Sequence, residues 1–435
     1  MYKGRILQLS SFLTIVCFAA SFISGCGMPA WTANRPAAEN VVRIGAIWPM
    51  TGPMSGVGLE LMNGANLAAE IINGDYPDLT LPLAKGKGLP NLGGARVVIV
   101  AGNHQGVPEK SMNEAERLIT QEKVAALLGG YQDGTTSAAS QVSERYGVPM
   151  LDESSTAPSL IARGYKWFFR MTPDEEVFIS NYMQLLKDLR AEEVLKEVKL
   201  GIIHDNTSWG FESGKVAVAA AKEQKYPVMA EMTYQSNNTN FQNDVTHLKN
   251  GKAGIVLQKA CEYDAGMLLK AYKDADYNPQ GILSLDPAVA SPEFIKKSGK
   301  NANGLYSREV WSLDLAAQKS LISKVNKLYK DKYGVDMTSN AARAFTAVLV
   351  LGEAMNRAGS MEPGALRKAL ETTDTPGEQT IMPWKGIKFD PKTHQNMLGV
   401  GIIIQVQNGK PVTVWPEKWA TKSAVWPVSK WSERK

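Results

Sequence analysis

Short runs of β-branched residues alternate with longer amphipathic segments along most of this chain. In the segment Leu59 to Asn73, for example, apolar side chains recur at the three- and four-residue spacing of one helix face. Strands separated by helices of this length run parallel, because a chain that returns through a crossover helix re-enters the sheet in the same direction. The pattern therefore predicts an α/β protein with parallel-rich sheets and helices on both faces.

The alternation runs through the chain twice, with a break at Pro173. Because 435 residues exceed what one hydrophobic core usually serves, each series is expected to form its own lobe. Predicted strands cover residues 41–47, 95–101, 124–128, 148–151, 198–204, 254–258, 282–285, 304–310, 397–407 and 412–415. The main predicted helices cover 59–73, 137–146, 174–190, 212–225, 264–272, 315–333, 340–358 and 363–372.

The N-terminus has the pattern of an export signal followed by a lipid attachment site. Lys3 and Arg5 precede an apolar run that polar residues interrupt, which suits a signal peptide better than a membrane span. Ile-Ser-Gly-Cys at 23–26 resembles the lipobox of bacterial lipoproteins. We expect a signal peptide at 1–25, lipid on Cys26 and a flexible tether over 26–40. A plain signal anchor with an incidental cysteine is the alternative.

Cysteine count and charge exclude several kinds of protein. With Cys17 removed in the signal peptide and lipid on Cys26, only Cys261 remains, so we expect no intrachain disulfide. The formal net charge is +5, and Lys and Arg are interspersed with Asp and Glu. A nucleic-acid-binding protein usually concentrates its basic residues in one stripe, so we expect no nucleic-acid partner.

Motifs for catalysis and metal binding are missing from the sequence. The four histidines include no pair at metal-binding helical spacing, and no Cys pair or G-x-S-x-G nucleophile motif occurs. We therefore expect no enzyme activity, no metal and no cofactor.

Six loops that follow predicted strands are rich in hydrogen-bonding residues. In open parallel sheets, ligands bind outside the carboxyl ends of the strands, so these loops would line one cleft if the two lobes face each other. The loops are 48–53, 129–136 and 152–157 in the first lobe, and 205–210, 259–263 and 286–290 in the second.

Two first-lobe loops run into predicted helices. Thr135 or Thr136 is expected to cap a helix that starts at Ser137, and Thr156 precedes the helix-opening pair Ala157-Pro158. Free backbone N–H groups at such places attract a carboxylate or another partly negative oxygen. Ordinary capping is the alternative reading.

Five segments stand in order along the chain: IGAIWPMTGPMS (44–55), NGANLAAEIIN (63–73), LLGGYQDGTTSAAS (127–140), YGVPMLDESSTAPSL (146–160) and YKWFFRMTP (165–173). Together they resemble the type I periplasmic binding proteins of the branched-chain amino acid transporter group. The resemblance implies two Rossmann-like lobes joined by three hinge crossings, near 170–173, 306–310 and 382–388. The implied lobes are 41–170 with 309–383, and 171–308 with 384–421, followed by a tail at 422–435.

The resemblance also implies that two first-lobe loops hold the carboxylate of the ligand. One loop contains Ser154, Ser155 and Thr156, and the other contains Asp133, Gly134 and Thr135. Many relatives have Ser where Asp133 stands. A carboxylate there repels a ligand carboxylate unless it points away or meets an ammonium group. An amide, a urea-like compound or a cationic solute therefore suits the site better than a standard α-amino acid.

In the second lobe, the family often has an aromatic side chain over the ligand where Trp209 stands. Glu262 and Asp286 are candidate partners for a ligand ammonium group, and Tyr263 offers a hydroxyl near the same edge. Trp48 either closes the cleft from the first lobe or packs under its loop. A buried core role for Trp209 and solvated positions for the two acids are the alternatives.

The expected function is that of an extracytoplasmic, lipid-anchored receptor of an ABC importer. Such a receptor closes its lobes on a small polar metabolite, such as an amino acid or an amide, and delivers it to the permease subunits. We expect a monomer that the lipid on Cys26 holds at the membrane. The alternatives are a ligand sensor on the same fold that signals to a membrane receptor, and a secreted enzyme.

Overall fold

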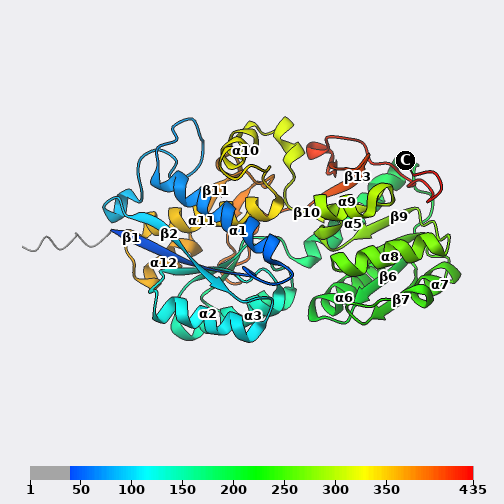
Figure 1. Ribbon diagram of the computed structural model, residues 1–435, viewed down its shortest axis with the longest axis horizontal. Coiled ribbons are helices and arrows are strands. Elements are labelled where there is room, and N and C mark those ends of the chain that lie inside the picture. The colour runs from blue at the N-terminus through cyan, green and yellow to red at the C-terminus, as the bar shows by residue number, and fades with distance from the viewer. Residues whose placement is uncertain (1–39, 435) are drawn as a thin grey trace, which may run out of the picture. The chain divides into compact units, whose positions relative to one another are not determined.

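The computed structural model describes residues 40–434, which contain two large sheets and a two-stranded sheet. The expected signal peptide, Cys26 and residues 26–39 of the expected tether lie outside the described residues. Figure 1 shows one lobe around β1 and β2 and a second around β6 to β9. The α/β fold with parallel-rich sheets in two lobes is confirmed.

The first lobe is built on a five-stranded sheet in the order β2-β1-β3-β4-β5, in which all neighbours are parallel. Its strands are β1 (Val41–Trp48), β2 (Arg96–Asn103), β3 (Ala126–Gly129), β4 (Met150–Asp152) and β5 (Phe168–Arg170). Its helices are α1 (Ser55–Asn73), α2 (Pro108–Thr120), α3 (Asp133–Tyr146), α4 (Pro158–Ala162), α10 (Ser320–Tyr333), α11 (Ser339–Ala358) and α12 (Pro363–Glu371).

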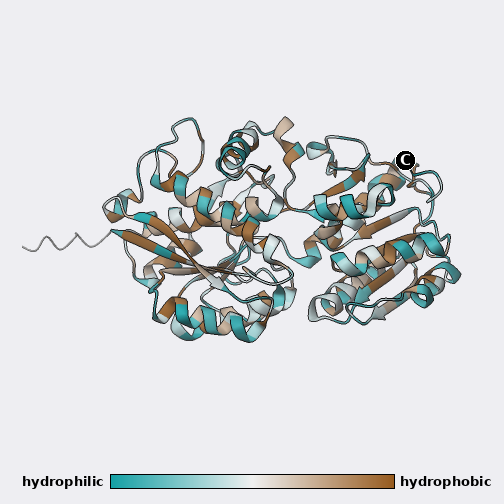
Figure 2. Cartoon of the chain, in the orientation of Figure 1, coloured by the Kyte–Doolittle hydropathy of each residue, from teal (hydrophilic) through white to brown (hydrophobic). Residues whose placement is uncertain are grey.

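Helices cover both faces of this sheet because alternate residues of each strand are apolar on opposite sides. Ile44 and Leu128 pack with α1 and α11 on one face, whereas Ile47 and Leu127 pack with α2 and α3 on the other. Figure 2 shows the resulting pattern, with hydrophobic strands inside and helices that are hydrophilic on their outer sides. At Gly64, α1 approaches α11 so closely that an added Cβ would overlap the backbone of Ala341.

The second lobe has a seven-stranded sheet in the order β14-β13-β10-β9-β8-β6-β7, antiparallel only at β10-β13 and β13-β14. Its strands are β6 (Leu200–Asp205), β7 (Val228–Tyr234), β8 (Ile255–Lys259), β9 (Gly281–Ser284), β10 (Tyr306–Glu309), β13 (Ile402–Gln407) and β14 (Lys410–Trp415). Its helices are α5 (Glu175–Ala191), α6 (Ser208–Glu223), α7 (Gln242–Asn250), α8 (Glu262–Asp274) and α9 (Pro292–Ser298). The expected helix over 315–333 is divided into a 3₁₀ turn at Leu313–Ala317 and α10.

The chain passes between the lobes three times, after β5, after β10 and before β13. The third passage lies later than the expected 382–388, because β12 (Gly386–Lys388) still pairs with β11 (Asp374–Pro376) and packs in the core of the first lobe. Further along, the N–H groups of Arg170 and Asn396 bond to His394 O and Arg170 O, at 3.0 and 2.8 Å. These bonds hold residues 394–396 beside the first passage, so the third passage begins only after Asn396. The other expected lobe boundaries stay predictions.

The segment expected to be a tail, 422–435, packs on the second lobe as far as Arg434. Trp426, Val428 and Trp431 are buried there, and the Trp431 indole N–H donates to Tyr277 O at 2.6 Å. Within residues 40–434, no helix has both the length and the apolar composition that a membrane crossing needs.

Candidate functional site

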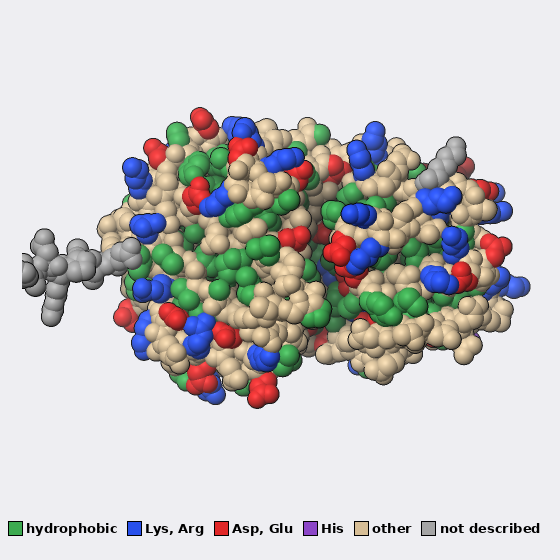
Figure 3. Space-filling model, in the orientation of Figure 1, with side chains coloured by type: hydrophobic (Ala, Val, Ile, Leu, Met, Phe, Trp, Pro, Cys, Tyr) green, Lys and Arg blue, Asp and Glu red, His purple; other side chains and the backbone are tan. Residues whose placement is uncertain are grey.

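A cavity of about 840 Å³ lies between the strand-end loops of the two lobes. All six loops that the sequence indicated contribute to its wall, through residues 53, 131–134 and 154–156 in the first lobe and 207–209, 259, 261–263 and 286–288 in the second. Figure 3 shows acidic and basic side chains gathered along the groove between the lobes. The strand ends of two parallel-rich sheets therefore converge on one site.

Nine of the eleven residues that we expected to contact ligand line this cavity. They are Asp133, Gly134, Ser154, Ser155, Thr156, Trp209, Glu262, Tyr263 and Asp286. The other two lie beneath it. Trp48 is fully buried under its loop and donates its indole N–H to Glu153 Oε1 at 3.0 Å, whereas the Thr135 hydroxyl donates to Gly130 O and to Gln132 O, the latter at 2.9 Å.

Helix α3 begins at Asp133, four residues before the expected start at Ser137. Three residues in the left-handed region, Gly129, Gly130 and Tyr131, turn the chain sharply enough for the helix to start there. The expectation that Thr135 or Thr136 caps the helix is therefore wrong, because both lie inside its first turns. The Thr136 and Ser155 hydroxyls instead lie 2.6 Å apart and join the two first-lobe loops.

Asp133 reaches from the start of α3 to the loop before α4. Its Oδ1 accepts the backbone N–H groups of Thr156 at 2.9 Å and of Ala157 at 3.1 Å. Burial raises the pKa of the Asp133 carboxyl to about 6, although these two N–H groups oppose the shift. The N–H groups that could have faced a ligand are thus occupied by a carboxylate of the protein itself.

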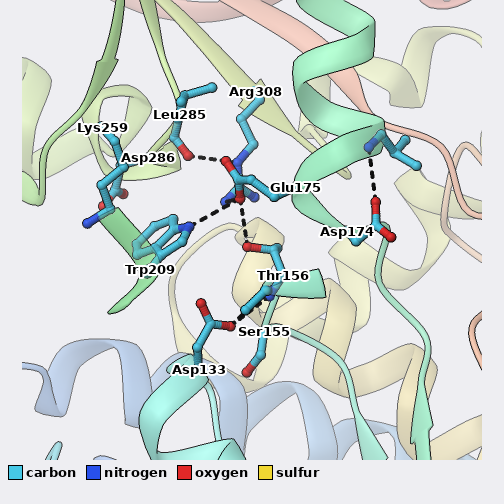
Figure 4. A network of polar contacts seen from close by, with 12 residues as sticks. Asp133, Ser155, Thr156, Asp174, Glu175, Trp209, Lys259, Leu285, Asp286 and Arg308 are labelled. Atoms are coloured by element: carbon cyan, nitrogen blue, oxygen red, sulfur yellow. Dashed lines mark hydrogen bonds and ion pairs between the residues drawn. The ribbon is translucent and has the colours of Figure 1, made fainter. Parts of the chain in front are cut away.

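Glu175, the first residue of α5, joins the lobes below the cavity. It is fully buried, and its Oε2 accepts the Thr156 hydroxyl at 2.8 Å and the Trp209 indole N–H at 3.1 Å. The Arg308 guanidinium lies 3.6 Å from the same oxygen and donates through Nε to Leu285 O at 2.8 Å. Figure 4 shows these side chains converging from both lobes on one carboxylate. Glu175 therefore fixes the orientation of two side chains in the cavity wall.

Trp209 lies over a buried ion pair. The ammonium group of Lys259 is 3.9 Å from the centre of the Trp209 ring and 2.6 Å from Asp205 Oδ2, and both charged side chains are buried. Trp209 is itself partly exposed to the cavity, so it is a wall residue and not a core residue.

The second-lobe acids differ in their partners. Asp286 is buried and accepts the N–H of Ala288 at 2.9 Å, and burial raises the pKa of its carboxyl, partly offset by Lys259. Glu262 instead pairs with Lys297 at 3.2 Å on the rim. Tyr263 is exposed at the same edge. Glu262 therefore has a cationic partner at ion-pair distance, whereas Asp286 forms no ion pair with a described residue.

Several residues of the site were not singled out from the sequence, namely Tyr131, Glu175, Lys259, Arg308 and Arg343. Lys259 could have been noticed, because a Lys that ends a buried strand needs a partner. Glu175 gives no such signal, since an acidic residue in a first helical turn is ordinary. In the described part of the chain, no group of three or more His, Cys, Asp or Glu side chains is arranged to hold a metal ion.

Comparison with known proteins now identifies the family, because a model of the family described as "Periplasmic binding protein" matches residues 41–410. The chain belongs to the periplasmic binding protein family. The resemblance found in the sequence is thereby confirmed, and the chain is a solute-binding receptor. A curated relative, Leu/Ile/Val-binding protein homolog 7 of Brucella abortus (strain 2308), is 27% identical over 396 residues, which cover 89% of this chain and 94% of the relative.

Solved structures show the same periplasmic binding protein fold at lower identity. A leucine binding protein from Thermotoga maritima superposes with a TM-score of 0.71 and 20% identity, covering 86% of this chain and 97% of that one. A solute binding protein of an ABC transporter from Rhodopseudomonas palustris BisB5, in complex with 3,4-dihydroxy benzoic acid, gives a TM-score of 0.69 and 14% identity, covering 91% and 100%. Both likenesses extend over nearly the whole described chain and support the two-lobed fold.

Proposed function

We propose that this periplasmic binding protein is the receptor of an ABC importer, which binds a small polar solute between its lobes and delivers it to the permease. The observation that carries the proposal is the cavity, whose wall comes from six strand-end loops, three in each lobe. A solute that contacts both walls favours the closed arrangement, because it gains contacts there that the open arrangement lacks. The closed form is then the one that the permease recognises.

We further propose that the chain acts outside the cytoplasm, with lipid on Cys26. The family description, "Periplasmic binding protein", supports the location, and Ile-Ser-Gly-Cys at 23–26 is the sequence feature that supports the lipid. Stable anchoring of a receptor beside its permease needs two or more acyl chains, which a lipidated N-terminal cysteine supplies.

The proposal is tested with the mature chain purified in detergent. Isothermal titration calorimetry against amino acids, amides, ureas, polyamines and aromatic acids should find at least one solute that binds with micromolar affinity. Thr156→Ala and Trp209→Ala should each weaken that solute tenfold or more, because the two side chains line the cavity and share the Glu175 carboxylate.

A matched control is Thr246→Ala, which removes an exposed hydroxyl that bonds within α7, outside the cavity wall. It should leave the affinity unchanged. If Thr156→Ala and Trp209→Ala also leave the affinity unchanged, the solute binds elsewhere and the cavity is not the site.

A further inference from the structure

The charges around the cavity are unequally compensated. Two of its buried cations are paired within the protein: Lys259 lies 2.6 Å from Asp205, and Arg308 lies 3.6 Å from Glu175. Arg343 donates to Asn340 Oδ1 and its charge lowers the pKa of the buried Glu153 and Glu309 carboxyls, but its Nε has no hydrogen-bond partner among the described residues.

Two carboxylates of the wall make no ion pair with any described residue. Asp133 accepts two backbone N–H groups, which are neutral donors. Asp286 accepts one, and the charges of Lys259 and Arg308 also stabilise its carboxylate. The Arg170 guanidinium, whose charge acts on Asp133, pairs with Asp174 at 3.4 Å and donates to Ala157 O at 2.7 Å. A carboxylate removed from water in this way gains most from a cationic donor.

The geometry of Asp133 also decides which ligand group is rejected. Its Oδ1 already takes the N–H groups of Thr156 and Ala157, at 2.9 and 3.1 Å. In Figure 4 the other carboxylate oxygen points away from Thr156, toward the part of the cavity that holds Trp209. A ligand carboxylate placed at this loop would find its donors occupied and a like charge in its path. A ligand N–H group would find an acceptor.

We propose that the solute of this receptor presents a cationic nitrogen group, an ammonium or a guanidinium, to Asp133 and has no carboxylate at that end. The inference rests on the proposed function, since it names the chemical class that the same cavity selects. Asp133 is then the residue that determines specificity, because its carboxylate accepts the two backbone N–H groups that would otherwise bind a carboxylate of the ligand.

Two substitutions separate the charge of Asp133 from its role as an acceptor. Asp133→Asn keeps an oxygen that can accept the N–H groups of Thr156 and Ala157 but removes the charge. Asp133→Ser removes the charge, and its side chain is too short to contact the N–H groups of Thr156 and Ala157. These two groups then become free to bind a ligand carboxylate. Glu109→Gln, an exposed acid in α2, is the matched control for a loss of one negative charge.

The experiment is calorimetric titration of the mature wild-type chain and the three variants with cationic probes (agmatine, putrescine and choline) and with leucine. We expect wild type and Glu109→Gln to bind at least one cationic probe and not leucine. Asp133→Asn should bind the cationic probe at least tenfold more weakly and still not bind leucine. Asp133→Ser should bind the cationic probe more weakly and bind leucine at least tenfold more tightly than wild type does. Circular dichroism of each variant establishes that it is folded.

The inference is overturned if leucine binds wild type and Asp133→Ser equally, if the cation binds all proteins equally, or if leucine alone binds wild type. Those outcomes leave the proposed function intact, because a solute still binds. If no solute of either class, and none of the broader panel, binds any of the proteins, the receptor function falls together with the inference.

Discussion

At the scale of single residues, the ionisation of Asp133 links the site to pH. Burial raises the pKa of this carboxyl to about 6 from an ordinary value near 4, so the group becomes neutral as pH falls through 6. Only the ionised form attracts a cation strongly. Because the shifted pKa lies above the ordinary one, the loss of charge occurs at mildly acidic pH, where exposed carboxylates remain ionised.

We therefore predict that the affinity of wild type for its cationic solute falls below about pH 6, by up to tenfold for each further pH unit. Calorimetry between pH 5 and 8 measures this dependence. Asp133→Asn, which has no proton to gain at this position, should bind weakly with little change over the same range. A wild-type affinity that is constant from pH 8 to pH 5 would contradict an ionised Asp133 as the partner of the solute.

At the scale of secondary structure elements, the turn between β3 and α3 positions Asp133. Gly130 has φ near +108°, and an added Cβ would lie 2.6 Å from the Thr136 Cα, so only glycine fits there without distortion. Gly134 lies inside α3, where an added Cβ meets only the Pro108 Cγ, at 3.6 Å. A side chain is therefore excluded at Gly130 but can be accommodated at Gly134, four residues later.

From this difference we predict that Gly130→Ala lowers the free energy of unfolding by about 3 kcal/mol, through backbone strain and overlap. Gly134→Ala should change it by less than about 1 kcal/mol, since alanine suits a helix and has room. Urea denaturation followed by circular dichroism measures both values. Equal effects of the two substitutions would show that the turn does not require glycine at residue 130.

Most elements could be predicted from the sequence because their apolar residues repeat with a clear period. The exceptions have physical reasons. β7 is an edge strand in which exposed side chains alternate with buried or partly buried ones, so no continuous apolar run indicates it. The start of α3 was placed too late because its first residues, Asp133 to Thr136, include no large apolar side chain that would mark a helix face.

At the scale of the whole molecule, the sequence predicted the cleft but not the contacts that join its two walls. Strand ends of two parallel sheets can be located from apolar runs, and the rule that ligands bind beyond them needs no coordinates. The role of Glu175 depends on Thr156, Trp209 and Arg308 meeting in space, which only the packing of the lobes decides. The third passage was misplaced for a similar reason, because β12 pairs with a strand of the first lobe.

A second contact between the lobes lies at the rim and tests closure directly. Glu212 of α6 accepts the Ser159 hydroxyl at 2.6 Å and the Ser159 backbone N–H at 3.3 Å, and Ser159 belongs to α4 of the first lobe. If these bonds form only when the lobes approach, they add to the stability of the closed form alone. Their loss should then weaken solute binding without any change in the wall of the cavity.

We predict that Glu212→Ala lowers the affinity for the solute about twofold to tenfold, which is the range expected for one or two partly exposed hydrogen bonds. Small-angle scattering at subsaturating solute should show a smaller decrease in the radius of gyration than in wild type, because fewer molecules close. Lys215→Ala removes an exposed charge from the same helix and should change neither quantity. An unaltered affinity in Glu212→Ala would mean that the bonds between Ser159 and Glu212 contribute equally to the open and closed forms, so they do not favour closure.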